Sequence, residues 1–172
     1  MDNWIYRHNA NDSARFVLGE IGFNNLICIG INPSTATPEN LDPTLKKVRR
    51  LAQENGFDGW LMLNVYPQRA TNPNHIHNDI DLSIHEENLT EIRNLVSELP
   101  TAHVWAAWGT LIRKRPFLIN CLRDVVNAIG DDKRWMNLNS LTKYSHPKHP
   151  LYLPINSEFN EFDINEYLAN HG

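Results

Sequence analysis

The sequence predicts a single α/β domain in which buried strands alternate with helices. Four short apolar runs end at polar or glycine-containing turns, as strands buried on both faces do. Segments with helical periodicity separate these runs, which indicates right-handed β-α-β crossovers and a mostly parallel sheet. The chain has 172 residues, enough for one good core but not for two. We therefore treat residues 1–172 as one domain.

The N-terminal part predicts a hairpin followed by a buried strand. Residues 4–7 and 15–18 flank a turn-rich segment at 9–13, which is the pattern of a β-hairpin. Residues 26–31 form a continuous apolar run that ends at Asn32-Pro33. This run is expected to be the first strand of the central sheet.

The first helix is expected to start at Asp42-Pro43. Aspartate is a good N-cap, and proline fits the first helical turn. Gly56 is placed to end this helix, because glycine tolerates the left-handed conformation of a C-cap. A second buried strand follows at residues 60–65. The long polar loop at 67–81 is rich in Asn, Pro and His, and loops of this length are usually functional or mobile.

The second half of the chain continues the alternation. The expected elements are helices at 83–99 and 110–129, strands at 102–108 and 134–138, and a short helix at 164–168. Pro116 is expected to break or restart the helix at 110–129, because proline removes a backbone donor.

Composition limits the classes of function. Hydrophobic residues make up 41% of the chain and charged residues 21%, an ordinary globular balance. No apolar run approaches the roughly 20 residues that cross a bilayer, and the N-terminus has no secretion signal. We therefore expect a cytoplasmic protein with no membrane partner. Cys28 and Cys121 lie in apolar runs and are expected to be buried. Two cysteines are also too few for a cysteine-only metal site.

The charge of the chain gives no general attraction to nucleic acid. The formal net charge is −4, so any DNA contact needs a local basic face. Two clusters, at residues 46–50 and 113–115, are candidates. Each cluster taken alone is more simply a solvated helix face.

A ligand site is expected beyond the carboxyl ends of the strands. Polar and aromatic side chains follow all four strands, in segments 30–36, 64–66, 108–110 and 146–152. An asparagine amide matches the imide edge of a pyrimidine, and a histidine can donate to an oxygen on which negative charge builds. These groups suit a reaction that expels a nucleobase as an anion. No carboxylate comes directly off a strand end, which argues against hydrolysis by paired carboxylates.

Each of these features also has a structural explanation. Asn32-Pro33 is a common turn in which Asn bonds to nearby backbone, and Asn64 could satisfy loop amides. Taken singly, such residues are more often structural than functional. Their recurrence at four strand ends is what favours a site.

Four segments resemble motifs of the uracil-DNA glycosylase superfamily, in that family's order. They are Gly-Ile-Asn-Pro at 30–33, Leu-Met-Leu-Asn at 61–64, the Trp-Gly segment at 104–109 followed by Lys114, and His-Pro-Leu at 149–151. The first resembles the mismatch-specific branch. The resemblance implies a three-layer α/β/α fold with a mostly parallel, roughly four-stranded central sheet plus the N-terminal hairpin.

A closer resemblance covers nearly the whole chain. It is to a bacterial and phage family catalogued only as a domain of unknown function, DUF1643. The segments that carry it are 32–36, 42–44, 69–71 and 149–153. This family implies no activity, so the function is inferred from the superfamily.

The superfamily resemblance implies roles for individual residues. Asn32 would orient the attacking water, and Asn64 would pair with the flipped base. His149 would stabilise the oxyanion of the leaving base, with His146 as a less favoured substitute.

Further residues complete the implied site. Leu151 or Tyr152 would wedge into the space that the base leaves, and Tyr66 would stack on the extruded base. The remaining candidates for the substrate pocket are Ser34, Asp42, Thr44 and Arg69. Asp42 is equally well explained as a helix cap.

Two departures from the superfamily bear on activity. Ser34 stands where the mismatch-specific motif has Gly, and Asn32 stands where the most active branches have Asp. Because Asn cannot act as a general base, a modest rate is expected. The usual His-Pro-Ser wedge is also replaced, by the segment 149–152.

The resulting hypothesis is a nucleobase-recognising protein, and its leading form is a DNA N-glycosylase that acts in DNA repair on a deaminated, mismatched or modified pyrimidine. It would act as a monomer and without a cofactor. Two alternatives stay open, namely a non-catalytic module that binds a modified base or nucleic acid, and an enzyme that acts on free nucleosides or nucleotides.

Histidines raise one further alternative, a metal site. His75, His77 and His85, with the pair His146 and His149, could supply imidazole ligands. They follow no metal-binding spacing, so we expect no bound metal.

Overall fold

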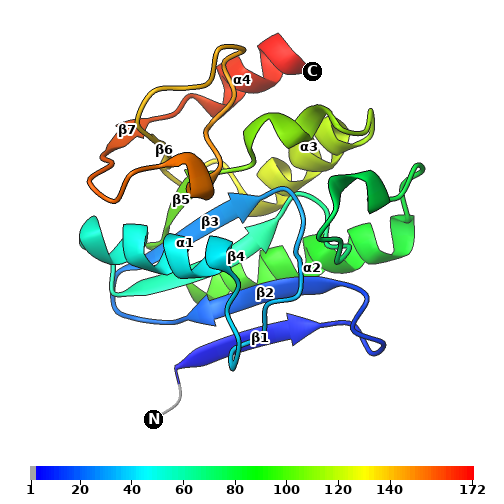
Figure 1. The fold of residues 1–172 in the computed structure, drawn as a ribbon, viewed down its shortest axis with the longest axis horizontal. Helices are drawn as coiled ribbons and strands as arrows, with labels where there is room; N and C mark the ends of the chain where they lie inside the picture. The colour runs from blue at the N-terminus through cyan, green and yellow to red at the C-terminus, as the bar shows by residue number, and fades with distance from the viewer. Residues whose placement is uncertain (1–2) are drawn as a thin grey trace.

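The computed structural model describes residues 3–172 and confirms an α/β protein. One seven-stranded sheet has the order β1-β2-β4-β3-β5-β6-β7 (Figure 1). The strands are β1 (Trp4–His8), β2 (Arg15–Glu20), β3 (Asn25–Gly30), β4 (Gly59–Asn64), β5 (His103–Ala106), β6 (Trp135–Leu138) and β7 (Phe159–Glu161). The α-helices are α1 (Pro43–Glu54), α2 (Leu82–Glu98), α3 (Leu118–Ile129) and α4 (Ile164–His171).

The sheet is mixed, so the expectation of a mostly parallel, roughly four-stranded sheet is wrong. Strands β4, β3, β5 and β6 run parallel to one another, as β-α-β crossovers require. However, β1 pairs antiparallel with β2, β2 with β4, and β7 with β6. The N-terminal hairpin therefore extends one edge of the sheet, and the C-terminal segment turns back to extend the other.

A glycine allows the hairpin to pack closely on the sheet. Gly19 of β2 lies opposite Leu61 of β4, and a Cβ at this position would meet the carbonyl oxygen of Trp60. The next residue of β2, Glu20, also contacts β4. Its carboxylate accepts a hydrogen bond from the Trp60 indole at 2.8 Å and forms an ion pair with Arg49 of α1. These contacts hold β2 alongside β4.

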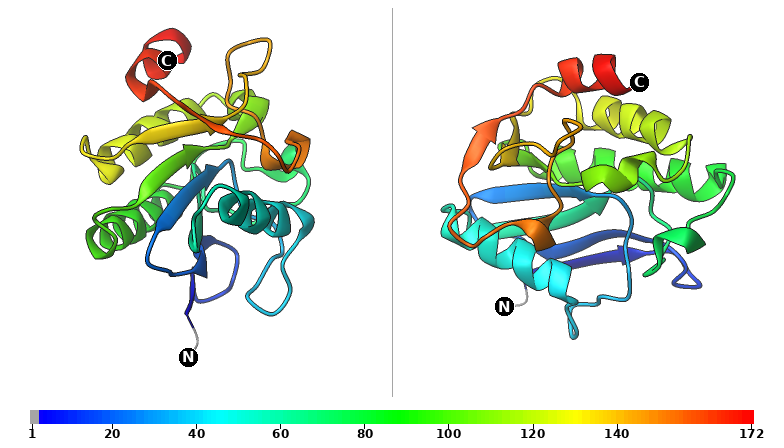
Figure 2. Two further views of the ribbon diagram at one scale, coloured as in Figure 1. Left: turned by 90° about the vertical axis from the view of Figure 1, so that its left-hand side faces the viewer. Right: turned by 45° about the horizontal axis from the view of Figure 1, so that its top comes forward.

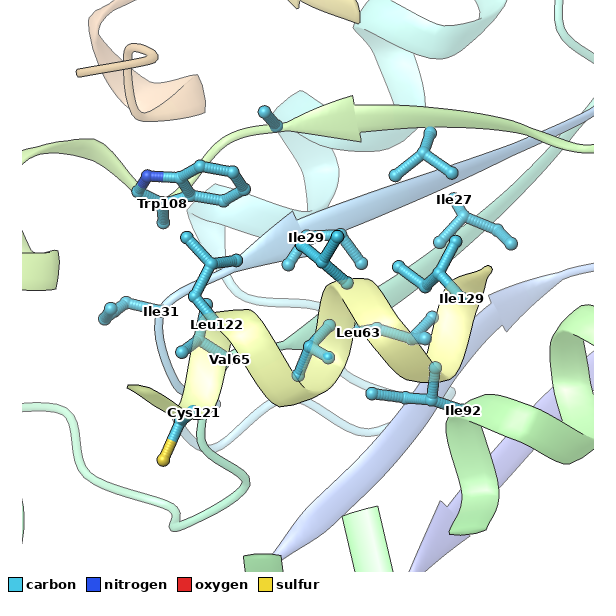
Figure 3. Packing of buried hydrophobic residues seen from close by; sticks show 14 of the residues in the cluster. Ile27, Ile29, Ile31, Leu63, Val65, Ile92, Trp108, Cys121, Leu122 and Ile129 are labelled. Carbon is cyan, nitrogen blue, oxygen red and sulfur yellow. The ribbon is translucent and has the colours of Figure 1, made fainter. Parts of the chain in front are cut away.

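Helices cover both faces of the sheet. Figure 2 shows the sheet edge-on, with α1 on one side and α2 and α3 on the other. On the α2 and α3 side, buried side chains such as Ile29, Leu63 and Leu122 interleave between strands and helices (Figure 3). On the α1 side, residues such as Leu51 and Met62 form a second apolar cluster. Burial on two faces explains why the central strands are apolar throughout.

The structure bears out the main elements that the sequence predicted and adds one strand and two short 3-10 helices. Helical structure breaks at Pro116, where a 3-10 turn at Gly109–Arg113 precedes α3. Cys28 and Cys121 are buried and free. The added strand is β7, a short and largely exposed edge strand. Among residues 3–172 there is no helix with the length and apolarity that a membrane span requires.

Candidate functional site

A cavity of about 560 Å³ opens at the carboxyl ends of the central strands. It lies where the chain leaves β3, β4 and β5, and the N-terminus of α1 and the 3-10 turn η3 (Pro150–Tyr152) also border it. Its lining comprises residues 30–34, 42–45 and 108–111, together with Arg15, Met62, Asn64, Ala70, Thr71, Pro73, His149, Leu151 and Tyr152. Four segments that the sequence placed after four different strands thus meet at one cavity.

Asn64 ends β4 at the floor of this cavity. Its side chain is 1% exposed, and neither Nδ2 nor Oδ1 has a hydrogen-bond partner among residues 3–172. Its own backbone carbonyl is satisfied by the Asn88 amide at 3.0 Å. An unsatisfied amide of this kind costs stability, because both polar atoms lose water without gaining a partner. Its donor and acceptor are therefore free to pair with a ligand.

Met62 and Gly30 lie beside the Asn64 amide. A Cβ at Gly30 would meet the Met62 methyl and, at 3.1 Å, the Asn64 Oδ1. A side chain at this position of β3 would displace the Met62 methyl and press on the Asn64 amide. Because methionine is flexible, its end can move aside where a rigid side chain could not.

His149 borders the cavity just before η3. Its Nδ1 accepts a hydrogen bond from the Leu151 backbone N–H at 3.2 Å, so the neutral ring carries its proton on Nε2. Burial lowers the pKa of His149, and the Asp42 carboxylate offsets part of that effect. At neutral pH the ring is therefore an uncharged Nε2–H donor. Gly109, at φ +63°, lets the chain pass within van der Waals contact of His149.

Asn32 lines the cavity but also holds two loops together. Its Nδ2 donates to the carbonyls of Pro33 at 3.1 Å, Gln68 at 3.1 Å and Ala70 at 2.9 Å. Only Oδ1 is left to accept a hydrogen bond from a ligand or water. This geometry also explains why the residue is Asn, since an Asp carboxylate would face three carbonyl oxygens.

The N-terminus of α1 brings a carboxylate to the cavity. Asp42 Oδ1 accepts a hydrogen bond from the Leu45 N–H at 2.9 Å, so Asp42 is the helix N-cap that the sequence predicted. It also lines the cavity, as does Thr44. No carboxylate comes directly off a strand, yet this helix supplies one.

Sequence reasoning missed Arg15, the first residue of β2. Its side chain is 2% exposed and lines the cavity. Burial lowers the pKa of Arg15 to about 10, and the positive charge of Arg69 adds to this effect. The sequence does contain a signal, because Arg15 interrupts the apolar run from Ala14 to Leu18.

Leu151 and Tyr152 stand at the rim. Leu151 is 48% exposed and Tyr152 82% exposed, and both line the cavity. Large apolar groups held this far into solvent are suited to contact a ligand larger than the cavity itself.

Ser34 and Arg69 shape the loops around the cavity. The hydroxyl oxygens of Ser34 and Thr71 lie 2.6 Å apart, and both residues line the cavity. Arg69 is not in the lining. It donates to the Ser34 carbonyl at 2.6 Å, to the Tyr6 hydroxyl at 2.6 Å and to Asp12 at 3.0 Å. Arg69 thus fixes the loop that carries Ser34.

Tyr66 lies away from the cavity, inside the core beneath the long loop. Its hydroxyl lies 2.7 Å from His77 Nδ1 and accepts from the Asp81 N–H at 2.9 Å, while its ring contacts Phe117. Burial raises the pKa of Tyr66 to about 12. A stacking role for Tyr66 would require the core to open.

His146 also lies away from the cavity, one layer behind it. The Trp108 indole donates to the Tyr167 hydroxyl at 3.0 Å, and that hydroxyl lies 2.8 Å from His146 Nδ1. Burial lowers the pKa of His146 to about 4, and His171 and Arg113 add to the effect. Of the two histidines in this loop, His149 is the one that borders the cavity.

Among the other histidines and the basic clusters, His85 and Arg115 have local partners. His85 Nε2 pairs with Asp124 at 2.8 Å, and over residues 3–172 no group of three or more His, Cys, Asp or Glu side chains is arranged to hold a metal ion. In the cluster at 113–115, Arg115 donates to the carbonyls of Ile76 and His77 and clamps the long loop. Arg115 therefore stabilises the conformation of this loop.

Comparison with known proteins identifies a family and no close neighbour. No curated protein and no solved structure matches the chain. A family model described as "Protein of unknown function (DUF1643)" matches residues 15–151, a span that contains the cavity residues from Arg15 to Leu151. The chain belongs to the DUF1643 family.

Proposed function

We propose that the cavity binds a nucleobase and that the protein is a DNA N-glycosylase acting on a deaminated, mismatched or modified pyrimidine. The observation that carries the proposal is the Asn64 amide, which is buried at the cavity floor with neither its donor nor its acceptor paired to any residue of the described chain, 3–172. A pyrimidine imide edge presents the complementary acceptor and donor. Met62 would move aside as the base enters.

The chemistry follows from three groups around the base. The neutral His149 would donate its Nε2–H to a base oxygen and stabilise the negative charge that develops there. Asp42 supplies the general base that Asn32 cannot be, and Asn32 would use its free Oδ1 to orient the water. In this step water attacks C1′ and passes a proton to Asp42. The N-glycosidic bond breaks, and the base leaves with the electron pair.

The exposed rim supports a nucleic acid as the substrate. Leu151 and Tyr152 protrude from the mouth of the cavity, where they could fill the gap left by an extruded base. A free nucleoside would need no such projection.

A base-release assay tests the proposal. Duplex and single-stranded oligonucleotides carrying uracil, hypoxanthine, a thymine mismatch or hydroxymethyluracil are incubated with the wild type, Asp42→Asn, His149→Gln and the surface control Arg134→Gln. Asn still caps a helix, so Asp42→Asn removes the base without removing the cap. We expect release by the wild type and the control, with losses of about 10²–10⁴-fold for Asp42→Asn and about 10²–10³-fold for His149→Gln.

Two other outcomes separate the alternatives. Binding that depends on Asn64 without release would make the protein a non-catalytic nucleobase-binding module. Release from free nucleosides or nucleotides, but not from DNA, would make it a nucleotide enzyme. Absence of both binding and release would contradict the proposed function.

A further inference from the structure

Arg15 is a buried cation with few partners. Its Nη1 donates one long hydrogen bond, 3.3 Å, to the Ala36 carbonyl, and its buried Nε has no partner within residues 3–172. No ion pair connects it to an acidic side chain within residues 3–172, although the charge of Asp42 acts on it from nearby. Among the described residues, Nη2 also has no hydrogen-bond partner, and unlike Nε it is not fully buried.

The neighbouring Arg69 shows what a satisfied arginine looks like in this region. Arg69 contacts the same Ala36 carbonyl, but it also binds the Asp12 carboxylate through Nε at 3.1 Å and Nη2 at 3.0 Å. Arg15 is the more deeply buried of the two and lacks such a carboxylate. A buried charge without a counter-charge is costly, so the structure maintains Arg15 at the expense of stability.

A second positive feature borders the same cavity, at the N-terminus of α1. This helix has 12 residues, and its first N–H groups lack intrahelical partners. Pro43 has no N–H, and the Leu45 N–H is bound by Asp42. The Thr44 N–H and hydroxyl, which lie at the positive end of the helix dipole, are therefore the groups available to bind an anion in the cavity.

We infer that the cavity takes a ligand bearing a phosphate group, which Arg15 binds through its guanidinium and Thr44 through the helix N-terminus. A guanidinium offers paired donors that match phosphate oxygens. This inference rests on the proposed function for the identity of the base, but the phosphate contact stands on Arg15 itself. The Asp42 carboxylate opposes the anion, so its neutralisation should strengthen binding.

Calorimetric titration with three probes tests the inference. The probes are inorganic phosphate, deoxyuridine and deoxyuridine 5′-monophosphate, each added to the wild type, Arg15→Met, Asp42→Asn and the control Arg134→Gln. We expect the monophosphate to bind at least about tenfold more tightly than the nucleoside, as one charged hydrogen bond provides. Arg15→Met should reduce this difference severalfold, Asp42→Asn should increase it, and Arg134→Gln should leave it unchanged.

Thermal unfolding without ligand checks that the Arg15→Met variant is folded. Arg15→Met keeps the length of the side chain and removes the uncompensated charge, so its melting temperature should equal or exceed that of the wild type. If the variant is destabilised, Arg15→Lys provides the second test, because it keeps the charge but loses the paired donors. Equal monophosphate affinity in the wild type and Arg15→Lys would overturn the inference.

The outcomes distinguish this inference from the proposed function. If the nucleoside binds through Asn64 and the phosphate adds nothing, the phosphate contact is wrong and nucleobase recognition survives. If inorganic phosphate binds through Arg15 but the nucleoside does not bind, the phosphate contact survives and nucleobase recognition is wrong. A dinucleotide with an internal phosphodiester separates the two sources. Tighter binding of the dinucleotide points to a DNA backbone, and tighter binding of the monophosphate to a free nucleotide.

Discussion

The amide nitrogen of Asn32 donates hydrogen bonds to three backbone carbonyl oxygens, and these bonds limit which residues can replace Asn32. We expect Asn32→Asp to lower the free energy of unfolding by about 3 kcal/mol, because three acceptors lose their donor and face a carboxylate. The same substitution should not raise base release, although it introduces a possible general base. Urea unfolding gives the stability, with the exposed Asn94→Asp as a control. A stable and more active Asn32→Asp would contradict this account.

The Asn64 amide, unlike that of Asn32, contributes no hydrogen bond to the fold among residues 3–172. Since neither of its polar atoms is satisfied, Asn64→Leu, which keeps the branching of the side chain, should leave stability unchanged or raise it by up to about 1 kcal/mol. Nucleoside binding should be lost in the same variant. Urea unfolding and calorimetry on one preparation would show both effects. A loss of several kcal/mol would mean that Asn64 serves the fold instead.

At the scale of elements, α1 combines a structural and a chemical role in Asp42. Asp42→Ala should cost about 1 kcal/mol through loss of the cap, while Asp42→Asn should keep the stability of the wild type. Both variants should lose base release. Thermal unfolding alongside the release assay checks this. If Asp42→Asn retained full release, the carboxylate would be a cap and nothing more.

Local sequence signals located most elements but not how they assemble. The buried strands and α1 were predictable because apolar runs, caps and prolines act over a few residues. The antiparallel contact of β2 with β4 depends on the close approach at Gly19, which no local pattern encodes. The edge strand β7 has three residues and little buried surface, so it left no hydrophobic signature.

The candidate site was predictable to a similar degree. Strand-end reasoning found Asn64 and His149 because strand termini converge whatever the details of the sheet. It missed Arg15, which reaches the cavity only because the hairpin is added beside β4. It included Tyr66, but alternation stops after β4 ends at Asn64, and Tyr66 packs in the same core cluster as its neighbour Val65.

At the scale of the whole molecule, buried histidines make stability depend on pH. Burial lowers the pKa of His146 from 6.5 to about 4, so the unfolded chain takes up a proton first as the pH falls. Stability should therefore be full above about pH 6.5 and should decline toward pH 4, with a slope of up to about 1.4 kcal/mol per pH unit for this one group.

The variant His146→Gln isolates this contribution. Glutamine does not titrate but can still accept a hydrogen bond from Tyr167. Its stability should fall less steeply than that of the wild type between pH 6.5 and pH 5, where most carboxylates stay charged. The remaining slope includes His149, whose pKa is also lowered by burial. Parallel slopes for the two proteins would show that His146 does not titrate in this range.

The central claim is that the unpaired Asn64 amide at the cavity floor recognises a nucleobase, and NMR of this amide tests it most directly. The Asn64 side-chain ¹⁵N–H₂ resonances are assigned by their absence from Asn64→Leu and followed as deoxyuridine is added. We predict saturable shifts of these resonances, as expected when the amide gains hydrogen bonds. If they stay unchanged at saturating nucleoside, or if Asn64→Leu binds the nucleoside as well as the wild type, the claim is wrong.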